Sequence, residues 1–271
     1  MTAIQPANQS GPIGVFDSGI GGLTVVAELQ RKLPSERILY VGDTARVPYG
    51  GKSPETVTRY SREISNLLIE EGAKMIVVAC NTASALAVPT ISEEYSIPVV
   101  GVLEPGALAA VRATRNGRIG VIGTKATIGS EAYSRAIRFF NPRLHVHSIA
   151  SPLLVPLIEE GLFNDEITEA ILHRYLEPLL QKGIDTLVLG CTHYPLLKPI
   201  VRKVCGQHIT LVDSAENCAV FVQSILTDTH SSRSNSRLDI LLTDTSEGFL
   251  RLAEKSLKLK IDSLNIRNIG H

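Results

Sequence analysis

The sequence predicts an α/β protein with two pseudo-symmetric α/β domains, each with a mainly parallel sheet, and a site in the cleft between them. Apolar runs of strand character alternate with helical patterns, which is typical of βαβ units. One short pattern occurs twice, as GAKMIVVACNT over Gly72–Thr82 and as GIDTLVLGCTH over Gly183–His193. The 271 residues are also enough for two domains of roughly 100 to 150 residues, each with its own core.

The first elements are short and well delimited. Ile13–Phe16 is an apolar strand that breaks into DSGIGG, and Thr24–Lys32 then has a helical pattern. Ile38–Gly42 is a second strand that ends at Asp43. Together they predict a strand, a helix and a neighbouring strand, the first part of a βαβ arrangement.

A longer helix follows and leads into the first copy of the repeat. Ser53 and Pro54 form a typical helix start, because serine caps the first turn and proline is favoured at the first helical position. The helix is predicted to run to about Glu71, and Met75–Ala79 is the strand that delivers Cys80. Apolar residues at helical spacing predict the buried face of this helix: Val57, Tyr60, Ile64, Leu67 and Leu68.

The second half repeats this plan. Ile119–Val121 has the same pattern as the first strand, and GTKATIG follows it where DSGIGG followed before. Leu144–Ile149 is the next strand, and Asn164 is predicted to cap a helix that runs to about Gln181. The interval between the two leading glycines equals the interval between the two cysteines. Helix, strand and cysteine therefore recur as one block, which indicates a duplication.

After Asp213 the plan changes. We expect Ser214 to cap a helix through Leu226, a polar loop over THSSRSNSR, a strand over Leu238–Leu242 and a closing helix over Glu247–Leu257. This tail is expected to return to the first domain, which makes that domain discontinuous. The predicted domains are 1–104 plus 214–271 for the first and 105–213 for the second.

Composition restricts the class of protein. The 27 basic residues balance the 27 acidic ones, so there is no charge field for nucleic acid. The N-terminus lacks the pattern of a signal peptide, and no apolar run reaches the ~18 residues of a membrane span. We therefore expect a cytoplasmic protein with no membrane or nucleic-acid partner. In that compartment the four cysteines are expected to be free thiols.

Polar residues stand where the predicted strands end. Ligands of parallel α/β sheets bind beyond the carboxyl ends of the strands. These residues therefore predict a site for a small polar substrate. They are Asp17, Ser18, Asp43, Cys80, Asn81, Thr82, Thr124, Cys191, Thr192 and His193.

The cysteines have two interpretations. A single cysteine at the end of a buried strand is most often a small core residue, and we assign that role to Cys205 and Cys218. Cys80 and Cys191 are different, because they occupy matched positions and are followed by polar residues. This pairing favours two thiols that face one cleft.

Other features keep alternatives open. The DSGIGG segment could be a phosphate-binding glycine loop, but it fits neither standard pattern, and a tight turn from strand to helix is simpler. His193 is either a structural histidine or a proton-transfer group beside Cys191. No pair of ligands has the spacing of a zinc site, so we predict no metal.

Two facing thiols suit the inversion of a carbon centre. One thiolate removes a proton from one face, and the opposite thiol returns a proton to the other face. A free thiol has a pKa of about 8.5, so the site must favour one thiolate through hydrogen-bond donors or a positive group. His193 and the threonines after each cysteine could supply these interactions, and Asp17 could hold or move the second proton.

The motifs also resemble those of the glutamate racemase family, whose members make D-glutamate for peptidoglycan without a cofactor. Together and in this order they are highly specific, and the similarity runs from about residue 12 to the final helix. The motifs are DSGIGGLT from Asp17, GDTARVPYG from Gly42, ACNTAS from Ala79, GTKATI from Gly123 and GCTHYP from Gly190.

The resemblance implies roles for particular residues. Cys80 and Cys191 correspond to the thiols on the two faces of the substrate carbon, and Asp17 and His193 resemble their acid–base neighbours. Asp43 and Glu159 match further polar positions around the site. The positions that correspond to substrate-binding residues are Asp17, Ser18, Tyr49, Gly50, Asn81, Thr82, Thr124, Thr192 and His193.

The resemblance further implies a glutamate-specific racemase, no pyridoxal phosphate or other cofactor, and a homodimer. Two other functions remain open from the sequence. One is a different activity of the same superfamily, such as an aspartate racemase, a hydantoin racemase or a decarboxylase. The other is an amino-acid-binding or redox-sensing module in which Cys80 and Cys191 form a reversible disulfide.

Overall fold

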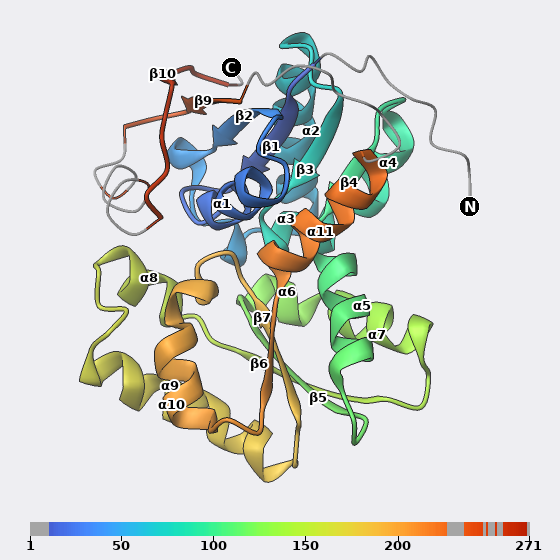
Figure 1. Ribbon diagram of the computed structural model, residues 1–271, viewed down its shortest axis with the longest axis vertical. Helices are drawn as coiled ribbons and strands as arrows, with labels where there is room; N and C mark the ends of the chain where they lie inside the picture. The colour runs from blue at the N-terminus through green and yellow to red at the C-terminus, as the bar shows by residue number, and fades with distance from the viewer. Residues whose placement is uncertain (1–10, 227–235, 246–247, 249–252, 254–256, 270–271) are drawn as a thin grey trace.

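The computed structural model describes residues 11–226, 236–245, 248, 253 and 257–269. It consists of two lobes, one above the other in Figure 1, and each lobe is built on one sheet. All strand pairs in both sheets are parallel. The predicted fold class is confirmed. Among the described residues, no helix is both long enough and apolar enough to cross a membrane.

The first lobe, at the top of Figure 1, contains a sheet with the order β10-β9-β2-β1-β3-β4. Its inner strands are buried on both faces, which explains their continuous apolar runs. The strands are β1 (Ile13–Asp17), β2 (Arg37–Gly42), β3 (Met75–Val78), β4 (Val99–Gly101), β9 (Arg237–Leu242) and β10 (Ser263–Ile266).

Helices cover both faces of this sheet. One hydrophobic cluster joins it to α1 and α11, and another joins it to α2, α3 and α4. These helices are α1 (Leu23–Lys32), α2 (Pro54–Glu70), α3 (Asn81–Leu86), α4 (Val88–Glu94) and α11 (Ser214–Leu226). Two short 3-10 helices, η1 (Thr44–Arg46) and η2 (Tyr49–Gly51), lie in the loop between β2 and α2.

The second lobe contains a sheet with the order β6-β5-β7-β8. Its strands are β5 (Arg118–Gly123), β6 (His145–Ala150), β7 (Thr186–Gly190) and β8 (Thr210–Asp213). One cluster packs α8, α9 and α10 on it, and another packs α5 and α7. The remaining elements are α5 (Leu103–Ala113), α6 (Lys125–Gly129), α7 (Ala132–Phe140), α8 (Leu154–Glu159), α9 (Glu166–Gln181), η3 (Tyr194–Leu197) and α10 (Lys198–Cys205).

The internal repeat is visible in the topology. β1 lies between β2 and β3, just as β5 lies between β6 and β7. The glycine that leads each copy of the pattern ends the preceding helix, because Gly72 and Gly183 have φ of +81° and +69°. Glycine adopts this left-handed conformation without steric cost, so it ends α2 and α9 and directs the chain into β3 and β7.

Two predicted helix caps are wrong by one residue. Asp165, not Asn164, caps α9, because the helix begins at Glu166 and the Asp165 side chain accepts from the Ile167 amide. Asp213, not Ser214, caps α11, since its Oδ1 accepts from the amides of Ala215 and Glu216. In both cases the aspartate directly precedes the first helical residue.

The tail contributes to the first lobe. β9 pairs with β2 and continues the sheet to β10, a strand that the sequence pattern did not predict. The predicted polar loop and closing helix fall mostly on residues outside the described ranges. Within residues 11–226 the chain passes between the lobes at the β4–α5 and β8–α11 junctions. On this basis we propose the domain division predicted above, 1–104 plus 214–271 and 105–213.

Candidate active site

A cavity of about 310 Å³ lies between the two lobes, at the carboxyl ends of β1, β3, β5 and β7. Asp17 and Asp43 lie behind its wall and are fully buried. The structure thus brings nearly all of the predicted site residues to one place. Those that line the cavity are Ser18, Tyr49, Gly50, Cys80, Asn81, Thr82, Thr124, Glu159, Cys191, Thr192 and His193.

The two cysteines reach this cavity from opposite lobes. Cys80 follows β3 and caps α3, with its Sγ 3.5 Å from the Ala83 amide nitrogen. Cys191 directly follows β7 of the second lobe. The two residues are only 5% and 6% exposed, and both line the cavity.

Cys80 lies in surroundings that favour the neutral thiol. Burial, reinforced by the charge of Asp17, raises the pKa of Cys80 to about 12, although the Ala83 amide and Ser18 act in the other direction. The thiol donates to the Ser18 hydroxyl at 3.6 Å. Cys80 is therefore placed to donate a proton at neutral pH.

Cys191 has an imidazole beside it. The Sγ of Cys191 is 3.8 Å from Nδ1 of His193, and Nε2 of His193 is 3.0 Å from Glu159 Oε1. Burial lowers the pKa of His193, but the hydrogen bonds to Cys191 and Glu159 outweigh burial and raise it to about 10. His193 is thus an imidazolium at neutral pH, and its Nδ1 faces the sulfur of Cys191.

Asp17 completes the first-lobe side of the site. Burial raises its pKa, against the charge of His193 and the amides of Gly22, Gly19 and Ser18. Its Oδ2 accepts from the Gly19 amide at 3.0 Å, and its Oδ1 is buried without a hydrogen-bond partner among the described residues. The Oδ1 atom of Asp17 can therefore accept a further hydrogen bond.

The glycines of DSGIGG permit a close approach between the lobes. A Cβ on Gly21 would lie 2.4 Å from Nδ1 of His193 and 2.5 Å from Oγ1 of Thr192. The Thr24 hydroxyl also donates to the Thr192 carbonyl at 2.8 Å. The segment is thus a turn from strand to helix, and it also packs against Thr192 and His193 of the other lobe.

Threonine hydroxyls gather where the start of α3 meets the start of α6. Thr82 Oγ1 lies 2.9 Å from Thr124 Oγ1 and 3.1 Å from Thr127 Oγ1. Thr124 also caps α6 by accepting from the Thr127 amide. A Cβ on Gly50 would lie 2.8 Å from Cβ of Thr124, so the η2 loop also closes onto this threonine. Thr127 was missed from the sequence, although its position three residues after Thr124 is that of a helix-capping partner.

Asp43 supports the η1–η2 loop from behind. It accepts from the Tyr49 hydroxyl, from Arg46 Nε at 2.8 and 3.0 Å, and from the Thr243 hydroxyl at 3.0 Å. Arg46 also pairs with Glu63 and lies 4.0 Å over the Tyr60 ring. Arg46 stands within the GDTARVPYG motif, but the sequence alone does not indicate that it holds the loop.

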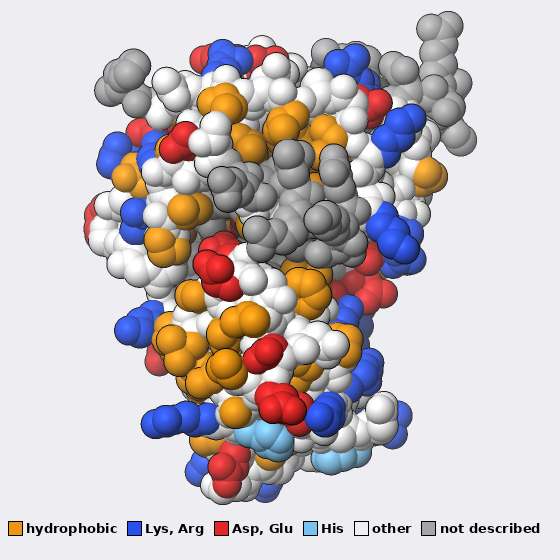
Figure 2. Space-filling model, turned by 90° about the vertical axis from the view of Figure 1, so that its left-hand side faces the viewer, with side chains coloured by type: hydrophobic (Ala, Val, Ile, Leu, Met, Phe, Trp, Pro, Cys, Tyr) orange, Lys and Arg blue, Asp and Glu red, His pale blue; other side chains and the backbone are white. Residues whose placement is uncertain are grey.

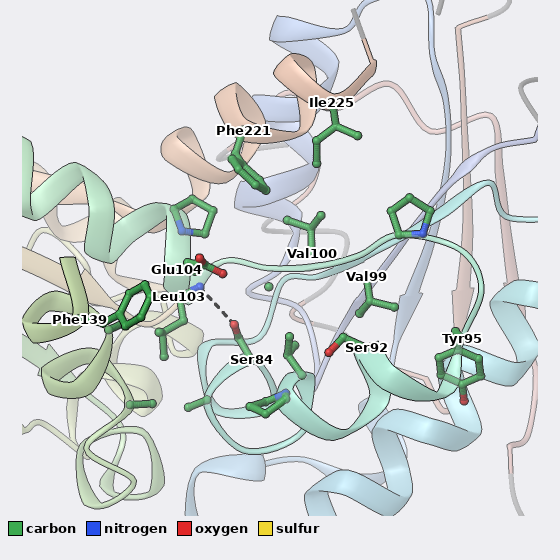
Figure 3. Close-up of a pocket in the computed structure, with 18 of the residues that line it drawn as sticks. Ser84, Ser92, Tyr95, Val99, Val100, Leu103, Glu104, Phe139, Phe221 and Ile225 are labelled. Carbon is green, nitrogen blue, oxygen red and sulfur yellow. Dashed lines mark hydrogen bonds between the residues drawn. The ribbon is translucent and has the colours of Figure 1, made fainter. Parts of the chain in front are cut away.

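A larger hollow of about 1020 Å³ lies beside the β4–α5 junction (Figure 3). It is lined from β4, α7 and α11 by side chains that include Val99, Phe139 and Phe221. At its edge the Ser84 hydroxyl accepts from the Leu103 amide. None of the predicted site residues lines this hollow, so volume does not identify the active site here.

The fold and the site define an enzyme of the racemase class. The model of the family Asp/Glu/Hydantoin racemase matches residues 20–221, and the chain belongs to this family. It is therefore an isomerase that acts on a small substrate. No group of three His, Cys, Asp or Glu side chains in the described part of the chain is arranged to hold a metal ion.

Within this family the chain is similar to glutamate racemases, which confirms the resemblance found in the motifs. It is 50% identical to the glutamate racemase of Geobacter metallireducens over 92% of this chain and 93% of that protein. A glutamate racemase isoform of Bacillus anthracis superimposes with a TM-score of 0.91 at 39% identity, covering 97% of this chain and 98% of the other. The Francisella tularensis glutamate racemase in complex with D-glutamate gives 0.90 at 36% identity, with 96% and 98% covered.

Proposed function

We propose that this protein interconverts L- and D-glutamate through a carbanion, with Cys80 and Cys191 as the two acid–base groups. The observation that carries the proposal is the delivery of both thiols from equivalent strand ends to opposite sides of one cavity. The similarity to glutamate racemases, one of which was solved with D-glutamate, supports glutamate as the substrate.

Each turnover moves two protons. The thiolate of one cysteine takes the proton from Cα, and the electron pair of the broken C–H bond is left on Cα and spreads into the carboxylate. The thiol of the other cysteine then gives its proton to the opposite face of Cα and becomes a thiolate. The reverse reaction exchanges the two roles.

The groups beside the two cysteines decide which of them holds a proton before the substrate binds. His193 stabilises a thiolate on Cys191, whereas Cys80 with its pKa of about 12 retains its proton. This state serves the enantiomer whose Cα–H faces Cys191. For the other enantiomer, one proton must first move from Cys80 to Cys191, and Asp17 and His193 are the titratable groups beside the thiols.

Substrate is held by small polar groups and backbone amides. We assign the ammonium and both carboxylates of glutamate to the predicted binding residues that line the cavity: Ser18, Tyr49, Gly50, Asn81, Thr82, Thr124, Thr192 and His193. Asp17 is fully buried behind the wall, and we assign it the acid–base role near Cys80. Most of these side chains are nearly buried, so binding takes place away from bulk water. A closed site strengthens the electrostatic interactions and keeps water from the carbanion.

In the cell we assign this activity to the supply of D-glutamate for peptidoglycan. We further propose a cytoplasmic homodimer that needs no cofactor and binds neither membrane nor nucleic acid. These assignments follow from the family resemblance and from the balanced charge of the chain.

The function is tested by assaying both enantiomers of glutamate and aspartate with purified protein and no added cofactor, by circular dichroism of the amino acid. We expect turnover of glutamate in both directions and little or none of aspartate. Preferential turnover of aspartate would move the assignment to another activity of the family. If the protein does not racemise either amino acid but forms a reversible disulfide between Cys80 and Cys191 on mild oxidation, the redox-sensing module is favoured.

A further inference from the structure

One side chain outside the cavity contacts the neighbours of both thiols. The Tyr133 hydroxyl, on α7, donates to Asn81 Oδ1 at 2.6 Å, and Asn81 directly follows Cys80. The same ring packs on Gly190, the residue before Cys191, where a Cβ would lie 3.1 Å from Tyr133 Cε2. Tyr133 thus spans the interval between the two strand ends that carry the thiols.

The Tyr133–Asn81 bond belongs to a chain of buried hydrogen bonds that crosses between the lobes and returns. Asn81 Nδ2 donates to Ser214 Oγ at 3.3 Å, and the Ser214 hydroxyl donates to the Leu189 carbonyl at 3.3 Å. Leu189 lies in β7, two residues before Cys191. The chain therefore links α7 and β7 of the second lobe through the first turn of α3 and the first residue of α11.

Burial makes these bonds consequential. Tyr133 and Asn81 are each 2% exposed and Ser214 is fully buried, so a broken bond leaves a polar atom without water to replace its partner. Burial also raises the pKa of Tyr133, which keeps its hydroxyl a donor. Two bonds fix the Asn81 amide, and one of them comes from Tyr133 of the second lobe.

We propose that Tyr133 is a positioning residue that sets the spacing of Cys80 and Cys191 across the cavity. It does not line the cavity and so does not contact substrate. The inference rests on the two-thiol racemisation proposed above. Proton transfer to opposite faces of one carbon requires both sulfurs within reach, so a change in spacing first affects delivery from the second thiol.

The test is Tyr133→Phe, which removes the hydroxyl and keeps the ring on Gly190. In deuterated water we measure deuterium at Cα in both the recovered starting enantiomer and the product. The ratio of exchanged starting material to product reports how the carbanion divides between the two thiols, and it does not depend on how much enzyme is folded. We expect this ratio to rise at least about twofold and kcat to fall about tenfold, with KM nearly unchanged.

Tyr95→Phe is the matched control, because the Tyr95 hydroxyl also donates to an asparagine side chain, Asn66, and neither residue lines the cavity. It should leave the ratio and kcat unchanged. Ser214→Ala breaks the same chain at another point and should raise the ratio as well, which keeps the test decisive if Tyr133→Phe folds poorly.

The outcomes separate the two proposals. A wild-type protein that does not racemise glutamate overturns the proposed function, and the inference with it. A racemising wild type with the same deuterium ratio in Tyr133→Phe and Ser214→Ala overturns the inference alone.

Discussion

Cys80 and Cys191 occupy equivalent strand ends but have different chemical neighbours. Cys80 is followed by Asn81, whose amide is held by Tyr133 and Ser214, and it lies near the carboxyl of Asp17. Cys191 has His193, which Glu159 contacts in turn. The two copies of one pattern therefore differ in the group beside each thiol, a carboxyl beside Cys80 and an imidazole beside Cys191.

The role of Glu159 is tested by the pH dependence of racemisation. His193 must be protonated to stabilise the Cys191 thiolate, so activity should fall as pH rises through about 10, where His193 loses its proton. The bond to Glu159 raises this pKa, and Glu159→Gln should therefore move the alkaline fall to lower pH.

Glu160→Gln is the control for this prediction. Glu160 is adjacent in sequence and exposed, as Glu159 is, but it does not line the cavity. Its pH profile should match that of the wild type. If activity falls at the same alkaline pH in Glu159→Gln as in the wild type, Glu159 has no role in keeping His193 protonated.

Residue types at the strand ends were predictable because parallel strands end at one edge of a sheet, and this placed Cys80, Cys191 and Thr124 together. The support behind them was not predictable. Tyr133 and Thr243 reach the site through tertiary packing from distant parts of the chain, and no local pattern marks such contacts.

At the scale of elements, the turn between β1 and α1 packs against Thr192 and His193 of the second lobe. Gly21→Ala would place a methyl group within 2.5 Å of His193 and Thr192. We expect kcat to fall roughly 100-fold, because displacing His193 separates it from Cys191, while the melting temperature changes little. Steady-state kinetics with a thermal melt measures both.

Gly129→Ala is the matched change, since a Cβ on Gly129 meets no atom within 4 Å. It should have wild-type kinetics. Equal activity of the Gly21 and Gly129 variants would contradict the close approach of the lobes.

The η1–η2 loop is held by Arg46, and this predicts an effect on binding. Arg46→Gln removes a charged hydrogen bond to Asp43, which also holds the Tyr49 hydroxyl. Because Tyr49 and Gly50 line the cavity, KM for glutamate should rise roughly tenfold, the effect of losing one such bond, and kcat should change less.

Arg59→Gln is the control for the loop. Arg59 contacts the same Glu63 and Tyr60 but is exposed, and Asp43 is not among its partners. Its KM should remain at the wild-type value. A comparable rise in both variants would mean that the loop depends on Glu63 and Tyr60 and not on Asp43.

Elements with a strong apolar period were predictable from the sequence, as with α2 and its Ser53-Pro54 start. Short or half-exposed elements were not. β10 has an exposed, partly polar pattern at the sheet edge, and the caps of α9 and α11 were displaced by one residue because Asp and its neighbour are both good capping residues.

At the scale of the whole molecule, the active site depends on how two half-sized α/β units face each other. Acidic and basic side chains are interspersed on the face shown in Figure 2, in keeping with a formal net charge of zero. The lobes meet through specific contacts: Gly21 with His193, Gly50 with Thr124, and Tyr133 with Asn81. Duplication explains why the thiols oppose each other, since each lobe brings the same strand end to the shared edge.

The most direct measurement is the racemisation of L- and D-glutamate in deuterated water by the wild type and by Cys80→Ser and Cys191→Ser, without added cofactor. The wild type should give product labelled at Cα from either enantiomer. Each serine variant should fold normally and fail to racemise, because a hydroxyl cannot replace the thiol as base or acid. Unlabelled product, or full racemisation by either serine variant, would contradict the two-thiol mechanism.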